Sequence, residues 1–145
     1  MLAGVNAGLS DLEDLKRLAD NTGDGHVIVE RARTDFTRLL ENCAVSISQG
    51  GYNTLMETLQ ARARAVVVPF SGDAETEQGL RAQLFSERGL IEVLHEDALT
   101  PKTLAASLDR AASRPRAVEL TLDLEGAKCT AGLVAGWTAN LSWQR

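Results

Sequence analysis

The chain has 145 residues, the length of one ordinary domain, and a hydrophobic content of 44%, typical of a globular protein. Its net charge of −5 and its scattered basic residues argue against nucleic-acid binding. Two cysteines and two histidines without ligand spacing exclude a disulfide framework and argue against a zinc site. The sequence shows no signal peptide and no apolar run near the ~18 residues of a membrane span, so we expect a cytoplasmic protein. We also expect no metal or other cofactor.

Short apolar runs alternate with helical patterns along the chain. The predicted strands are residues 1–5, 26–29, 45–48, 65–69 and 91–94. The predicted helices are residues 11–21, with Ser10 as N-cap, 34–42, 52–61, 77–89, with Gly89 at the C′ position, and 100–113, opened by Thr100 and Pro101. Beyond Pro115 the pattern weakens, although residues 120–124 alternate like a strand and 126–133 favour a helix.

This rhythm predicts a doubly wound, Rossmann-like α/β fold, in which a parallel sheet carries helices on both faces. The run at 65–69 is the most β-branched in the chain and should be a fully buried strand. Cys43 lies beside an apolar run and should pack as a small hydrophobic residue. Without an internal repeat or linker, residues 1–145 are expected to form a single domain.

A glycine pair between a strand and a helix is the most informative feature. Gly50 and Gly51 follow the strand at 45–48, and a helix opens directly behind them. The first N–H groups of that helix have no helical acceptor and lie at the positive end of its dipole, so an anion, most often a phosphate, is the expected ligand. After the strand at 65–69 comes an acidic, amide-bearing loop with Asp73, Glu75, Glu77 and Gln78. Together these segments predict a nucleoside-diphosphate ligand with a hydroxyl-rich part. Asp73 and Glu75 match no pattern and are interpreted as solvated charges.

An ordered series of motifs resembles the C-terminal domain of family 28 glycosyltransferases, in the GT-B superfamily, whose best-known member transfers N-acetylglucosamine in peptidoglycan synthesis. The series is Ser48-x-Gly50-Gly51-x-x-Thr54-x-x-Glu57, Val-Val-Val-Pro-Phe at 66–70, Glu77-Gln78-x-x-Arg81-Ala82, Gly89-Leu90, and Leu99-Thr100-Pro101-x-x-Leu104. The resemblance covers residues 26–113 best and leaves 114–145 as a C-terminal extension.

The resemblance implies a donor site for a nucleotide-sugar, with UDP as the family's commonest nucleotide. The diphosphate would lie at Gln49, Gly50, Gly51, Tyr52, Asn53 and Thr54. Glu57 would accept hydrogen bonds from the ribose hydroxyls. The backbone around Ala32 and Arg33 would read the nucleobase edge, and Glu77 and Gln78 would hold the sugar.

Each of these residues also has a simpler structural interpretation. Thr54-x-x-Glu57 has the spacing of a capping box, in which Glu57 only reaches back to a backbone N–H. Gly50 and Gly51 can form an ordinary strand-to-helix turn. Glu77 and Gln78 can be exposed first-turn residues of a helix, where glutamate is favoured by the dipole.

The same resemblance implies that the first strand–helix unit of the domain is missing. In the 3-2-1-4-5-6 strand order this strand is central, and its absence leaves unpaired edges. The run at 120–124 could replace it, or a second copy in a homodimer could lend a strand.

The acceptor-binding N-terminal domain, which commonly supplies the catalytic base, is missing as well, so no catalytic residue is assigned. We expect the donor-binding part of a metal-independent glycosyltransferase, which is active only with an acceptor-binding domain or subunit. The alternative is a non-catalytic, Rossmann-like remnant or subunit that acts through protein contacts.

Overall fold

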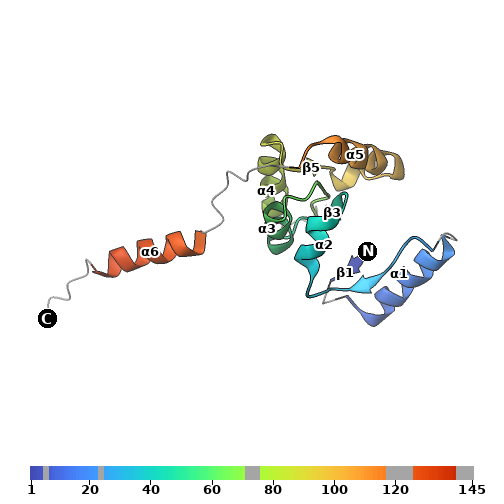
Figure 1. Ribbon diagram of the computed structural model, residues 1–145, viewed down its shortest axis with the longest axis horizontal. Coiled ribbons are helices and arrows are strands. Elements are labelled where there is room, and N and C mark those ends of the chain that lie inside the picture. Colours follow the sequence, from blue (N-terminus) through green and yellow to red (C-terminus); the bar gives the residue numbers. More distant parts are fainter. Residues whose placement is uncertain (5–6, 23–24, 71–75, 117–125, 140–145) are drawn as a thin grey trace.

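The computed structural model describes residues 1–4, 7–22, 25–70, 76–116 and 126–139, and within them it is an α/β protein with parallel strands (Figure 1). The strands are β1 (Leu2–Ala3), β2 (Glu30–Arg31), β3 (Ser46–Ser48), β4 (Ala65–Val67) and β5 (Glu92–Val93). The helices are α1 (Leu9–Asn21), α2 (Phe36–Asn42), α3 (Tyr52–Gln60), α4 (Thr76–Glu87), α5 (Pro101–Ser113) and α6 (Gly126–Ala139), with a 3₁₀ turn η1 (Glu96–Ala98) that was not predicted. None of the described helices is long and apolar enough to cross a lipid bilayer.

The described strands form two parallel sheets rather than one. β1 pairs with β2, and β3, β4 and β5 form a second sheet in that order. In the second sheet Ser46 lies opposite Ala65, and Val66 lies opposite Glu92. The break between the two sheets falls between β1 and β3. The run at 120–124, proposed as a substitute, lies outside the described residues.

β4 is the centre of the three-stranded sheet and is buried on both faces, as predicted. Its residues Ala65 and Val67 pack in one cluster with side chains of α3 and α4, namely Leu55, Leu59 and Ala82, and with Ile91. Val66 faces the opposite side and packs with Leu94 and with Ala111 of α5. Figure 1 shows α5 across this sheet from α3 and α4. Helices therefore cover both faces, as expected for a doubly wound fold.

A separate cluster joins α2 to the chain that follows α3. Leu40 is 3% exposed and packs with Ala61 and Ala63, and Phe36 and Cys43 lie at its margin. The Sγ atom of Cys43 lies 3.3 Å from the carbonyl oxygen of Leu40. Cys43 packs against this cluster and is half-buried.

Two predicted boundaries near the N-terminus are wrong. The strand predicted at 26–29 is instead Glu30–Arg31, because Leu2 lies opposite Glu30 in a parallel pair and residues 26–29 lie beyond the start of β1. The first helix begins at Leu9 with Gly8 as its N-cap, so Ser10 lies inside the helix. The Asp11 carboxylate accepts a hydrogen bond from the Gly8 N–H at 3.3 Å, which satisfies the helix start in place of a serine hydroxyl.

Local signals at other helix ends are confirmed. Gly89 has φ +71°, and the Leu90 N–H donates to the Phe85 carbonyl at 3.0 Å, which closes the end of α4. Thr100 caps α5 by accepting the Thr103 N–H at 3.1 Å, with a proline at the first helical position. At the C-terminal side, α6 continues to Ala139 rather than ending at 133, and Figure 1 shows it apart from the other elements.

Candidate functional site

The turn between β3 and α3 depends on a glycine. Gly50 has φ +74°, a conformation that side chains rarely adopt, and a Cβ added there would lie 2.5 Å from Cγ1 of Val67. The Gly50 N–H donates to the Ser48 hydroxyl oxygen at 3.3 Å. The chain therefore leaves β3 in direct contact with the core of β4 and turns at once into α3.

The N-terminus of α3 carries no side-chain cap. Gly51 is the N-cap residue, with φ −52° and ψ 148°, and Tyr52, Asn53 and Thr54 form the first turn. Their N–H groups have no acceptor within the helix, so this end offers donors and a positive dipole to a ligand. Because Thr54 is already the third residue of the helix, the capping box proposed for Thr54 and Glu57 is not formed.

Glu57 lies one turn further along α3. It is three and four residues from Thr54 and Asn53, so the three side chains lie on one face of the helix. Glu57 is half-buried, and no hydrogen bond or ion pair among the described residues uses its carboxylate. An acceptor-only group is thus available beside the open helix end.

The first turns of α4 meet the start of α3 through Arg81. The Arg81 guanidinium lies 5.1 Å from the centre of the Tyr52 ring and forms an ion pair with Glu77. This contact brings the residues predicted for the diphosphate beside those predicted for the sugar. Glu77 lies in the first turn of α4, as its simpler interpretation required, and Gln78 is half-buried. Asp73 and Glu75 lie outside the described residues.

The sequence alone did not indicate a role for Arg81 at this site. Its spacing of four residues from Glu77 on a predicted helix was the available signal for an ion pair. The contact with Tyr52 had no local signal, because it depends on how α3 and α4 pack.

The loop after β2 is held by Arg33, whose partners are Glu30 of β2 and Asp35 in the loop. Arg33 Nε and Nη2 each donate to the Asp35 carboxylate at 2.8 Å, and Nη1 lies 3.1 Å from Glu30. Ala32 and Arg33 are exposed, and no hydrogen bond or ion pair between described residues links them to α3 or α4. The base-reading role of this loop stays a prediction.

Hydrogen bonding from Arg33 lowers the pKa of Asp35 below its ordinary value of 3.8. A carboxyl group with a lowered pKa adds stability above its unfolded-state pKa, and this contribution is lost as the pH falls through the folded-state value. Arg33→Met is expected to return the pKa of Asp35 toward 3.8, as measured by NMR titration of its carboxyl carbon. Arg31→Met is the control and should leave the pKa unchanged. Equal pKa values in the wild type and Arg33→Met would contradict the pairing.

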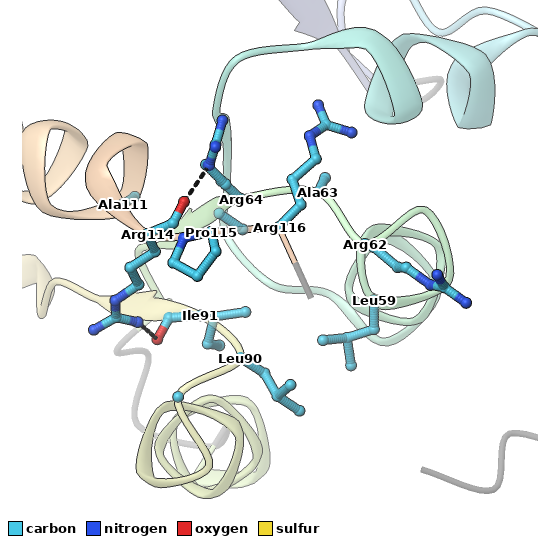
Figure 2. A pocket seen from close by; sticks show the side chains of 12 residues that line it. Leu59, Arg62, Ala63, Arg64, Leu90, Ile91, Ala111, Arg114, Pro115 and Arg116 are labelled. Carbon is cyan, nitrogen blue, oxygen red and sulfur yellow. Dashed lines mark hydrogen bonds between the residues drawn. The ribbon is translucent and has the colours of Figure 1, made fainter. Parts of the chain in front are cut away.

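A cavity of about 420 Å³ lies at the opposite end of the sheet, where β4 and β5 begin (Figure 2). It is lined by apolar side chains and by arginines, and none of the predicted site residues reaches it. Arg64 Nε donates to the Arg114 carbonyl at 2.6 Å, and Arg114 Nη1 donates to the Ile91 carbonyl at 3.1 Å. Arg64 and Arg114 thus stabilise the backbone around the cavity through hydrogen bonds to carbonyl groups. Because parallel α/β sheets bind ligands beyond the carboxyl ends of their strands, the glycine turn is the stronger candidate site.

Within the described ranges, no group of three or more histidine, cysteine, aspartate or glutamate side chains is placed to hold a metal ion. The polar features of the candidate site are instead the backbone donors at the start of α3, the Glu57 carboxylate, and the side chains at the start of α4. The backbone donors at the start of α3 can bind an anion, and the Glu57 carboxylate and the side chains at the start of α4 can bind hydroxyl groups.

Parallel strands, helices on both faces and a glycine turn before an uncapped helix define the Rossmann-like α/β class. Residues 7–125 match the glycosyltransferase family 28 C-terminal domain. The chain belongs to this family.

Two curated relatives are similar over most of this chain. An uncharacterised glycosyltransferase of Methanopyrus kandleri is 29% identical over 117 residues, which cover 81% of this chain and 33% of that protein. The UDP-N-acetylglucosamine--N-acetylmuramyl-(pentapeptide) pyrophosphoryl-undecaprenol N-acetylglucosamine transferase of Rubrobacter xylanophilus is 29% identical over 101 residues, which cover 70% of this chain and 30% of that protein. The chain thus spans about a third of the length of these relatives.

Among solved structures, the glycotransferase of kitacinnamycin matches with a TM-score of 0.49 and 24% sequence identity. The match covers 79% of this chain and 27% of that chain.

Proposed function

We propose that this chain is the donor-binding part of a glycosyltransferase that transfers a hexosyl group from a nucleoside-diphosphate sugar to an acceptor hydroxyl. The uncapped start of α3 behind Gly50 and Gly51 is the observation that carries the proposal. UDP is the first nucleotide to test, because the Rubrobacter relative is named for a UDP-sugar.

The chemistry assigned to this chain is stabilisation of the leaving group. The acceptor oxygen forms a bond to the anomeric carbon as the bond from that carbon to the diphosphate breaks. The departing negative charge is stabilised by the N–H groups and dipole of α3, without a metal ion. An acceptor-binding domain or subunit takes up the hydroxyl proton, so this chain is active only with that partner.

Amide-resolved NMR titration of the 145-residue chain with UDP, GDP and dTDP tests the proposal. The expected result is saturable shifts from Gly50 to Glu57 with one nucleotide preferred. A folded sample that shows no shifts with any of the three would contradict nucleotide binding.

Glu57→Gln tests the ribose contact. Loss of a charged acceptor for two hydroxyl groups is expected to weaken UDP binding about 10-fold, with little change in the free energy of unfolding. The variant should also lose the preference for UDP over 2′,3′-dideoxy-UDP, as measured by calorimetry. Glu13→Gln, on the exposed face of α1, is the control. A folded variant that keeps the wild-type preference would contradict a ribose contact.

The second candidate is a subunit that acts through protein contacts without binding a nucleotide. Ile47 on β3 is 51% exposed, and among the described strands β3 pairs only with β4. On α6, Leu133, Val134 and Trp137 are also exposed. The absence of NMR shifts with all three nucleotides would favour this candidate.

A further inference from the structure

Arg81 links the two helices that form the candidate site, and the proposed function gives it no role. Its guanidinium carbon lies 5.1 Å from the centre of the Tyr52 ring, and Tyr52 is the first residue of α3. Its side chain is only 18% exposed, although it carries a full charge. The charge is therefore held beside the helix end at which we place the diphosphate.

A guanidinium in this position keeps donors for a ligand. It stays protonated and has five N–H groups in a plane, so contact with the Tyr52 ring and an ion pair with Glu77 leave further N–H groups for a ligand. Nη2 forms the ion pair with Glu77. The Glu77 side chain is 82% exposed, so water screens this pair and its net free energy is small. A diphosphate is a stronger competitor, because it offers more charge and more acceptor oxygens.

We propose that Arg81 binds the diphosphate of the donor, and that the diphosphate replaces Glu77 as its partner. This inference rests on the proposed function and deepens it. The exchange frees the Glu77 carboxylate to accept hydrogen bonds from sugar hydroxyls. Binding of the diphosphate to Arg81 thereby makes the Glu77 carboxylate available to the sugar.

Calorimetric titration of the full chain with UDP, UMP and uridine tests the contact; the guanosine series replaces it if GDP gives the stronger NMR shifts. Arg81→Met keeps an unbranched apolar stem and removes the charge. It is expected to weaken UDP binding about 10-fold and uridine binding less than about 2-fold. Arg88→Met is the matched control, because it makes the same chemical change away from the candidate site. The Arg88 guanidinium donates to the Leu84 carbonyl at the far end of α4. It should bind UDP as the wild type does.

The outcomes separate this inference from the proposed function. Wild-type binding of UDP together with unchanged binding by Arg81→Met overturns the role of Arg81 and leaves the donor site standing. Equal losses for UDP and uridine also overturn it, because they indicate a general disturbance of the site. A wild-type chain that binds none of the nucleotides overturns both.

Glu77→Gln tests the exchange of partners. Removal of the competing carboxylate is expected to strengthen UDP binding by about 2- to 5-fold, the range that a weak exposed ion pair allows. Unchanged or weaker UDP binding would overturn the exchange. Tyr52→Leu should weaken UDP binding, because it removes the ring that lies beside the Arg81 guanidinium.

Discussion

Replacement of Gly50 by alanine is expected to lower the free energy of unfolding by about 3 kcal/mol, the sum of a left-handed backbone penalty and overpacking. The alanine would have to hold φ +74° with its Cβ 2.5 Å from Val67 Cγ1, and Val67 is fully buried in β4. Relief of the clash requires movement of the turn or of β4. Urea denaturation of both proteins measures the difference.

Gly51→Ala is the matched control, because Gly51 has negative φ and open space at its Cβ position. We expect its change to stay within about 1 kcal/mol, the scale of a cap substitution. In a double-mutant cycle, Val67→Ala should offset part of the Gly50→Ala loss, because it removes the methyl group that the new Cβ would meet. A stable Gly50→Ala protein would show that the turn does not require a glycine.

Leu55→Ala should lower the free energy of unfolding by a similar amount. Leu55 is 0% exposed and packs with side chains of β4 and α4, so truncation is expected to cost about 3 kcal/mol through lost burial and a cavity. Leu80→Ala is the control for the same chemical change, since Leu80 is 61% exposed on α4 and should cost less than about 0.5 kcal/mol. Urea denaturation compares the three proteins.

Because Leu55 lies on the buried face of α3, the variant should still bind UDP in conditions where it stays folded. A loss below about 1 kcal/mol would mean that the site collapses around the smaller side chain, contrary to the dense packing expected of a core. Loss of UDP binding by a folded Leu55→Ala protein would show that the core cluster also sets the position of the helix end.

Features with local chemistry were predictable from the sequence. The α3 start at Gly50 and Gly51, the Thr100–Pro101 start of α5 and the Gly89 end of α4 depend on backbone conformation and nearby hydrogen bonds. The buried character of β4 followed from its continuous run of apolar residues. Local signals also competed, because the Thr54-x-x-Glu57 spacing suggested a cap that Gly51 occupies instead.

Features that depend on distant pairing were not predictable. The position of β2 is set by its register with β1, which lies 28 residues earlier in the chain, and the apolar run at 26–29 carried no sign of it. The Tyr52–Arg81 contact likewise depends on the packing of α3 against α4. Residue types suggested the group at the start of α3 and the group at the start of α4 separately, but only the tertiary structure brings the two groups together.

The division into two sheets has a consequence for ligand affinity. No strand pairing in the described residues ties the β1–β2 unit, which carries the loop of Ala32 and Arg33, to the sheet that carries the glycine turn. Helix α2, which follows that loop in the chain, packs against α3 and the residues after it. A nucleotide that spanned both would fix their relative orientation, and its measured affinity would be reduced by the entropy lost in doing so. Any partner that held the two units together beforehand would remove that cost and act as an affinity regulator without contacting the nucleotide.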